Sequence, residues 1–272
     1  MHKQYTPVEE LRLFGGVTTS LFGPRALQDK ENLDWSFKAI SPHGDPGICA
    51  QRLWHLSRLA SERGITDAFA PNPSTFNGLV TPNQSLLTKG YRLHEDHPFR
   101  LWRGNPPVMA DGLILERGQT FALSSADCPT LLVWDPSRKR LGVVHCGLLS
   151  LARGVVDNLI NALGADPATL QAFITAGAHN LPYELQEKTH PELRRFLTKY
   201  EGTDNFKSVA LYSLIRQLFA EAGGDTNRVA CNKICTIACG DGFLYSQHRD
   251  HKTERSNRRN LVLVQNGAGN TR

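Results

Sequence analysis

Residues 124–147, SSADCPTLLVWDPSRKRLGVVHCG, decide the fold of this chain. They contain two short apolar runs, 130–134 and 141–144, whose β-branched and aromatic residues predict buried strands. The polar stretch between the runs predicts a turn. If the two strands pair as an antiparallel hairpin, the residue before the first and the residue after the second lie at the same end of the sheet. These flanking residues are Cys128 and His145.

Outside the hairpin, helical and strand-like patterns alternate along the chain. Apolar residues spaced three to four apart over 148–163 predict a helix directly after the hairpin, closed by Gly164 and Pro167. Other stripes and β-branched runs predict more elements. These are helices at 49–63, 191–199 and 205–222, and strands at 121–123 and 260–264. The mixture predicts a chain of the α/β class, in which one broad domain and two smaller ones remain open.

A thiol and an imidazole side by side support two kinds of chemistry. They can bind a metal together, or the imidazole can act as the base for a thiol nucleophile. Because a helix is predicted to begin after Gly147, free N–H groups there would face an anion. The ordinary alternative is a buried cysteine beside a histidine with satisfied hydrogen bonds.

Several motifs, in their order along the chain, carry a family resemblance. The clearest lie at 14–20, 110–114, 125–129, 142–147 and 243–250, and shorter ones lie at 32–33, 183–185 and 235–236. With these motifs the chain resembles the YfiH/laccase-domain family, also called the multicopper polyphenol oxidase or purine nucleoside phosphorylase family. The resemblance implies an α/β fold, a single compact layered domain over residues 1–272 with a mixed β-sheet and the site at one sheet end.

The resemblance also implies a zinc ion held by Cys128, His145 and a histidine from an earlier motif. Asn83 stands where that histidine is expected, and a neutral carboxamide is a poor zinc ligand. Replacement ligands are conceivable at several positions: His94, His97, Cys146, His179 and His248. The Trp-Arg pair that follows the third ligand in the family is Leu148-Leu149 here, which removes a guanidinium suited to phosphate.

The resemblance implies that the chain is an enzyme that processes purine nucleosides. Zinc on Cys128 and His145 would activate water or phosphate, for deamination of adenosine or for phosphorolysis of adenosine or inosine. Asp127 is expected to orient a ligand, and Arg249 to contact a phosphate or ribose oxygen. Asn83 and Gly147 complete the expected substrate contacts.

Two other readings stay open at this point. Without the first histidine, Cys128 could be a nucleophile and His145 its base, as in metal-free Cys-His hydrolases and deamidases, with N–H groups near Gly147 meeting an oxyanion. The fold of the family is also similar to that of bacterial toxins that deamidate glutamine. The other reading is an inactive binding or regulatory relative. A multicopper cluster is disfavoured, since it depends on many imidazoles.

Composition limits the partners. The 272 residues carry a formal net charge of +5, and the densest basic stretch, 249–259, also contains acidic residues, so nucleic-acid binding is not expected. No apolar run is long enough to cross a bilayer, and the first ten residues lack a signal-peptide core. We expect a cytoplasmic protein with a small-molecule nucleoside, and phosphate, as its partners. Its cysteines, including Cys231, Cys235 and Cys239, are expected as reduced, buried thiols.

Overall fold

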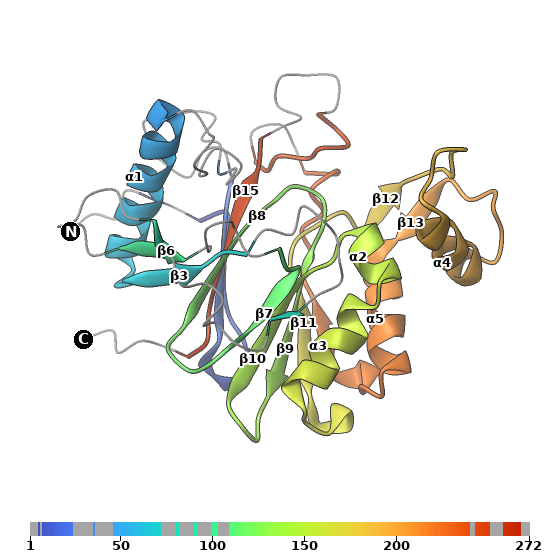
Figure 1. The fold of residues 1–272 in the computed structure, drawn as a ribbon, viewed down its shortest axis with the longest axis horizontal. Coiled ribbons are helices and arrows are strands. Elements are labelled where there is room, and N and C mark those ends of the chain that lie inside the picture. Colours follow the sequence, from blue (N-terminus) through green and yellow to red (C-terminus); the bar gives the residue numbers. More distant parts are fainter. Residues whose placement is uncertain are drawn as a thin grey trace.

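Two β-sheets packed face to face form the centre of the molecule, in a computed structural model (Figure 1). The structure describes residues 5, 7–23, 35, 46–71, 80–81, 90–91, 99–102, 109–239, 243–250 and 258–267. Asn83, His94 and His97 lie outside the described residues. Within the described part, no helix has the length and apolar character needed to cross a membrane.

The first sheet joins strands from both ends of the chain. Among the described residues it has seven strands in the order β1-β2-β15-β8-β3-β6-β5. Their bounds are Glu9–Arg12, Thr18–Phe22, Asn260–Gln265, Thr120–Ser125, Asp67–Phe69, Arg100–Trp102 and Gly90–Tyr91 in that order. β15 pairs antiparallel with both β2 and β8, whereas β3 pairs parallel with β6 and β8. The sheet is therefore mixed, as predicted.

The second sheet carries the predicted hairpin at its centre. Six strands are described, in the order β14-β11-β9-β10-β7-β4. Their bounds are Val229–Cys231, Gln171–Ile174, Thr130–Asp135, Arg140–His145, Gly112–Leu115 and Val80–Thr81. A separate pair joins β12 (Asn180–Pro182) to β13 (Ser208–Ala210). β9 and β10 pair antiparallel with Thr130 opposite His145, so the hairpin and its register are confirmed.

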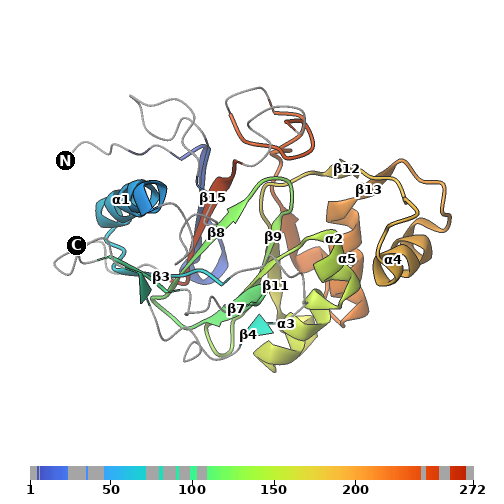
Figure 2. The same cartoon turned by 45° about the horizontal axis from the view of Figure 1, so that its top comes forward.

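Helices cover the outer faces of both sheets, which gives four layers. α1 (Pro46–Glu62) packs on the first sheet, and α2 (Leu148–Ala152), α3 (Val155–Leu163) and α5 (Leu211–Glu221) pack on the second. α4 (Pro191–Glu201) lies against α2. Figures 1 and 2 both show α1 on the opposite side of the sheets from α3 and α5. The innermost core lies between the sheets, where Phe121 and Val262 meet Leu132 and Trp134.

Two predicted helices are shorter than the apolar pattern suggests. The helix expected at 148–163 is divided into α2 and α3, because Gly154 has a positive φ of 74° that an α-helix does not accept. The segment 205–222 contains β13 at 208–210, and its helix starts only at Leu211. The expected helix at 49–63 is α1, and the one at 191–199 is α4.

Candidate functional site

Cys128 and His145 meet at one end of the β9–β10 hairpin. The backbone N–H of Cys146 donates to the carbonyl of Pro129 at 2.9 Å, which extends the ladder past His145 and brings residue 128 beside it. The His145 ring is hydrogen-bonded to Cys128 and is 6% exposed, while Cys128 is half-buried. The hairpin thus joins the thiol and imidazole that the sequence places at its two flanks.

Asp111 lies behind His145 and is a site residue to which the sequence analysis assigned no role. β7 pairs antiparallel with β10, and the N–H of His145 donates to the carbonyl of Asp111 at 2.8 Å. The Asp111 Oδ1 lies 3.6 Å from the His145 Nδ1 and accepts a 2.8 Å hydrogen bond from the Ser150 hydroxyl. Asp111 is therefore a buried carboxylate that is fixed by Ser150 and faces the imidazole.

Gly112 explains how β7 comes so close to the hairpin. A Cβ at this position would lie 2.2 Å from the carbonyl oxygen of Val143 and 2.9 Å from the Cα of Val144. Since no side chain fits in that space, only glycine allows the backbone next to Asp111 to approach β10. The Ala-Asp-Gly motif was the available sequence signal for this contact.

The charges around His145 favour its protonated form. Burial lowers the pKa of His145, but the adjacent Cys128 and the facing carboxylate of Asp111 together outweigh burial and raise the pKa from 6.5 to about 9. The neighbouring Cys146 is fully buried, and burial raises the pKa of its thiol. Of these two thiols, Cys128 is the one placed beside the imidazole and partly open to solvent.

The carboxylate of Asp127 is hydrogen-bonded to other segments of the chain. Its Oδ1 accepts from the Thr236 hydroxyl, and its Oδ2 from the backbone N–H of His248, both at 2.8 Å. Its carbonyl accepts from the N–H of Ala178 at 2.7 Å. Asp127 therefore joins the turn that carries Cys128 to three other segments, an arrangement different from the ligand-orienting role expected from the sequence.

Arg249 is occupied by the protein. Its Nη1 donates to the carbonyls of Thr236 and Cys239 at 2.9 and 2.8 Å, and its Nη2 to the carbonyl of Leu244 at 2.6 Å. Its Nε and Nη2 also donate to the Asp250 carboxylate at 3.0 and 3.1 Å. Since a guanidinium has five N–H donors, none is left for phosphate or ribose in this conformation. In this conformation Arg249 holds the loop together, and its contact with substrate stays a prediction.

The other residues predicted for the site are Gly147, His179, His248 and Asn83. Gly147 is buried and caps α2. His179 packs on the Tyr212 ring with the centroids 4.3 Å apart, and its Nε2 is buried with no hydrogen-bond partner among the described residues. His248 is exposed at the surface. The position of Asn83 is not among the residues described.

The side chains of the site meet only part of what a zinc ion requires. Cys128 and His145 are suitable in type, and a carboxylate behind a ligating histidine is a common arrangement in zinc sites. However, no group of three metal-binding side chains occurs among the described residues, so neither His179 nor His248 joins the pair. The described residues therefore supply two ligands and do not make up a zinc site.

Comparison with known proteins finds a family whose model matches most of the chain. The model of the family described as multi-copper polyphenol oxidoreductase laccase matches residues 72–261. A purine nucleoside phosphorylase of Streptomyces griseus is 31% identical over 148 residues, which are 53% of this chain and 59% of that protein. One of Streptomyces coelicolor is 32% identical over 153 residues, 54% of this chain and 63% of that protein. The matched region thus spans less than two thirds of these relatives.

Solved structures share the fold over nearly the whole chain. A protein of Neisseria meningitidis has a TM-score of 0.67 at 18% identity and covers 97% of this chain and 99% of its own. YlmD of Geobacillus stearothermophilus has a TM-score of 0.64 at 14% identity, with the same coverage of 97% and 99%. At these identities the likeness concerns the fold alone.

Proposed function

The chain belongs to the family described as multi-copper polyphenol oxidoreductase laccase, and from this membership we propose that it is an enzyme that processes purine nucleosides. The observation that carries the proposal is the contact between Cys128 and His145, with Asp111 behind the imidazole, inside the matched region. The names of the curated relatives add support, because they are purine nucleoside phosphorylases.

In the metal-free form of the proposed reaction, His145 supplies the proton. With a raised pKa of about 9, its ring is protonated at neutral pH. When the bond between the sugar and the purine breaks, the proton passes to a purine nitrogen, and an oxygen of phosphate or water bonds to the sugar carbon. In deamination, the proton would pass instead to the departing amine while water attacks the purine carbon. Asp111 keeps the ring oriented in both cases.

The cations near the site bear on whether phosphate or water attacks the sugar carbon. Arg249 has no free donor, and Arg153, at the end of α2, pairs with Glu192 at 2.9 Å. Together with Leu148-Leu149 in place of the Trp-Arg pair, this means that the usual phosphate contact is missing among the described residues. Water therefore has to be tested beside phosphate as the acceptor.

Zinc is the proposed metal in a second form of this site, in which Cys128 and a neutral His145 are its ligands, because an imidazole bound to zinc cannot carry the donated proton. When bound, zinc would act as a Lewis acid that activates an oxygen nucleophile. The described residues provide only these two ligands. A cytoplasmic location is also proposed, since the described cysteines are all free thiols.

A second candidate is a metal-free thiol hydrolase or deamidase. It is favoured by the arrangement of Cys128, His145 and Asp111. The thiol contacts the imidazole and the carboxylate faces it from behind, as in enzymes with an activated nucleophile. In this reading the Cys128 sulfur attacks a carbonyl carbon, and the imidazolium returns a proton to the leaving amine or alcohol. Water then releases the acyl group from the sulfur.

One set of measurements separates these readings. Metal content is measured by mass spectrometry on the purified protein without a tag, beside Cys128→Ser, His145→Gln and the matched control Cys231→Ser. Turnover of adenosine and inosine is followed with and without phosphate. About one zinc per chain, lost in Cys128→Ser and kept in Cys231→Ser, supports the zinc enzyme.

Other outcomes point elsewhere. If turnover of nucleosides requires Cys128 but no metal, the enzyme processes nucleosides with Cys128 and His145 alone. Hydrolysis of an amide or ester, with alkylation of Cys128 abolishing it, would support the second candidate. An intact fold with no turnover of nucleosides, esters or amides would contradict both and leave an inactive relative.

A further inference from the structure

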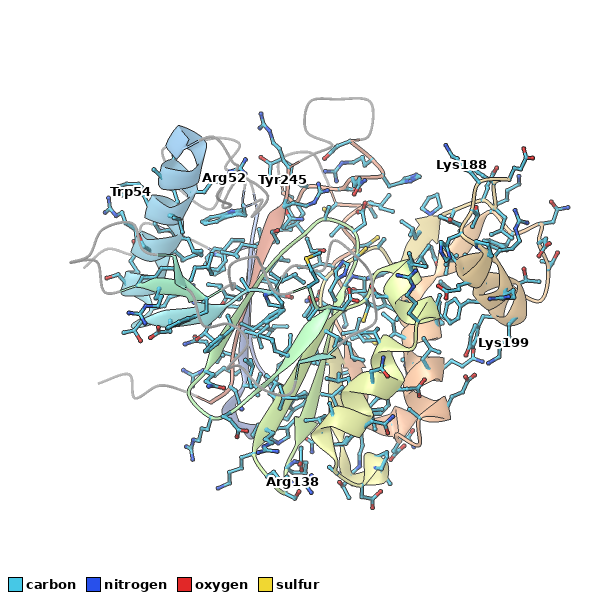
Figure 3. The ribbon with its side chains drawn as sticks, viewed as in Figure 1. Arg52, Trp54, Arg138, Lys188, Lys199 and Tyr245 are labelled. Atoms are coloured by element: carbon cyan, nitrogen blue, oxygen red, sulfur yellow. The ribbon has the colours of Figure 1, made fainter. Side chains whose placement is uncertain are left out.

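A cavity of about 360 Å³ lies at the opposite end of the β9–β10 hairpin from Cys128. It is lined by Gly15, Arg117, Trp134, Pro136, Lys139 and Asn266. Arg138, labelled in Figure 3, belongs to the same turn as Lys139 and marks this lower end of the hairpin. Since β10 runs from Arg140 to His145, the cavity is separated from the Cys128 pair by roughly 20 Å at about 3.3 Å per residue. Its volume lies in the range of small-molecule sites.

Hydrogen-bond donors without acceptors surround this cavity. In the described part of the chain, the guanidinium of Arg117, the ammonium of Lys139 and the indole N–H of Trp134 have neither a hydrogen bond nor an ion pair. Trp134 is only 6% exposed, whereas Arg117 and Lys139 are exposed, so that the indole forms a wall and the two cations lie at the rim. None of the described residues that line the cavity is acidic.

The neighbouring cations make the contrast clear. Arg138 donates to the carbonyls of Leu163 and Gly164 at 2.8 and 2.6 Å, and Arg140 pairs with Glu116 at 2.9 Å. The basic residues of this turn that point elsewhere therefore have partners, whereas the two that line the cavity do not. Both cations are exposed, so they are available to receive a negative charge from a ligand.

The walls of the cavity are held in place. Lys139 is the one non-glycine residue with a positive φ, 56°, among those the structure describes, and its carbonyl accepts from the Asn266 Nδ2 at 3.1 Å. Asn266 also donates to the carbonyl of Leu115 at 2.8 Å. Gly15 packs on the indole, because a Cβ there would lie 2.3 Å from two of its ring carbons. The donors are thus presented by a fixed frame.

We propose that this cavity binds the phosphate group of inorganic phosphate or of a small phosphate monoester. The two cations supply charge and the indole supplies a directed N–H, a combination that matches the several acceptor oxygens of a phosphate. The site is separate from the Cys128 pair, so the inference does not depend on the proposed function. It assigns the molecule a second ligand, at the far end of the hairpin.

Calorimetric titration tests the proposal in a buffer free of phosphate and at constant ionic strength. Wild-type protein is titrated with sodium phosphate and, separately, with ribose 5-phosphate, with sodium chloride as the blank. Saturable binding of about one equivalent is expected. Arg117→Ala and Lys139→Ala are expected to raise the Kd by roughly tenfold or more each, since each loses a charge-assisted hydrogen bond. Trp134→Phe, which removes the N–H and keeps most of the ring, is expected to raise it less.

Two further variants serve as controls. Lys207→Ala removes an exposed cation that pairs with Glu184 elsewhere, and it should bind like the wild type, while Cys128→Ser reports whether phosphate binds at the Cys128 pair instead. Binding of the monoester alone would identify the ester as the ligand, and equal binding of both would identify the phosphate group itself. The proposal is overturned if no saturable binding occurs, if Arg117→Ala and Lys139→Ala bind as the wild type does, or if Cys128→Ser abolishes binding.

Discussion

Replacing Arg249 with alanine tests whether this arginine holds the loop together or binds substrate. The substitution removes donors to the carbonyls of Thr236, Cys239 and Leu244 and leaves the carboxylate of Asp250, whose side chain is 6% exposed, without its cation. Breaking a buried ion pair from one side costs about 3–5 kcal/mol. The Arg249 side chain is itself 19% exposed, so we expect the lower part of that range, about 3 kcal/mol.

Urea denaturation measures this loss as a change in the free energy of unfolding. Since a typical domain is stable by about 5–15 kcal/mol, the variant should still fold, with a clearly lower midpoint and an unchanged slope. Arg216→Ala is the matched control, because Arg216 is an exposed arginine with a hydrogen bond to the carbonyl of Thr226 at 3.2 Å. It should change stability by less than about 0.5 kcal/mol.

A double variant adds a sharper control. Because Arg249 and Asp250 share two hydrogen bonds, Arg249→Ala/Asp250→Ala should lose less stability than the two single variants together. The reasoning is refuted if Arg249→Ala unfolds at the wild-type midpoint while the KM for nucleoside or phosphate rises. Arg249 would then contact substrate, as the sequence alone suggested.

Three other predictions follow from the described contacts. Asp111→Asn should weaken zinc binding by about 10–100-fold, because the residue behind the imidazole loses its charge, and titration with zinc would contradict this if the affinity stayed the same. The His145 pKa is raised from 6.5 to about 9, so the charged ring stabilises the metal-free fold fully below about pH 6.5, and this contribution is lost as the pH rises through 9. The difference in unfolding free energy between wild type and His145→Gln should therefore shrink between pH 6.5 and 9.5, and a constant difference would count against the shift. Gly142→Ala should cost about 1–3 kcal/mol in denaturation, because its Cβ would lie 2.4 Å from the Leu159 Cδ1 on α3, and a wild-type midpoint would show that α3 moves away freely.

The sequence predicts the parts of the site that depend on local chain geometry. Two apolar runs and a short polar turn are enough to fix the hairpin register, which brings Cys128 to His145. The role of Asp111 was not predicted, because its place behind the imidazole comes from the pairing of β7 with β10. No pattern within 110–114 indicates which strand lies next to β7. Register between distant strands is set by the whole sheet.

Arg249 and Gly154 illustrate two other limits. The basic residue beside Asp250 is visible in the sequence, but the acceptors that occupy it are backbone carbonyls, which every residue has. Apolar spacing continues through Gly154 without a break, so periodicity predicts one helix where a single left-handed residue makes two. The layered α/β fold was predicted, but its division into two facing sheets depends on the inner core that only the assembled strands form.

The position of β15 between β2 and β8 sets an order for biosynthesis. β2 has hydrogen-bonded neighbours only in β1 and β15 within the described sheet, so it cannot join β8 until β15 has left the ribosome. Roughly 240 residues separate Phe22 from Asn260, and at about 5–20 residues per second the nascent β1–β2 pair waits ~10–50 s with an open edge. During this time the unpaired strand is accessible to chaperones and to other nascent chains. A ribosome that stalls before residue 260 would therefore hold a chain whose second sheet can already form while its first sheet cannot close.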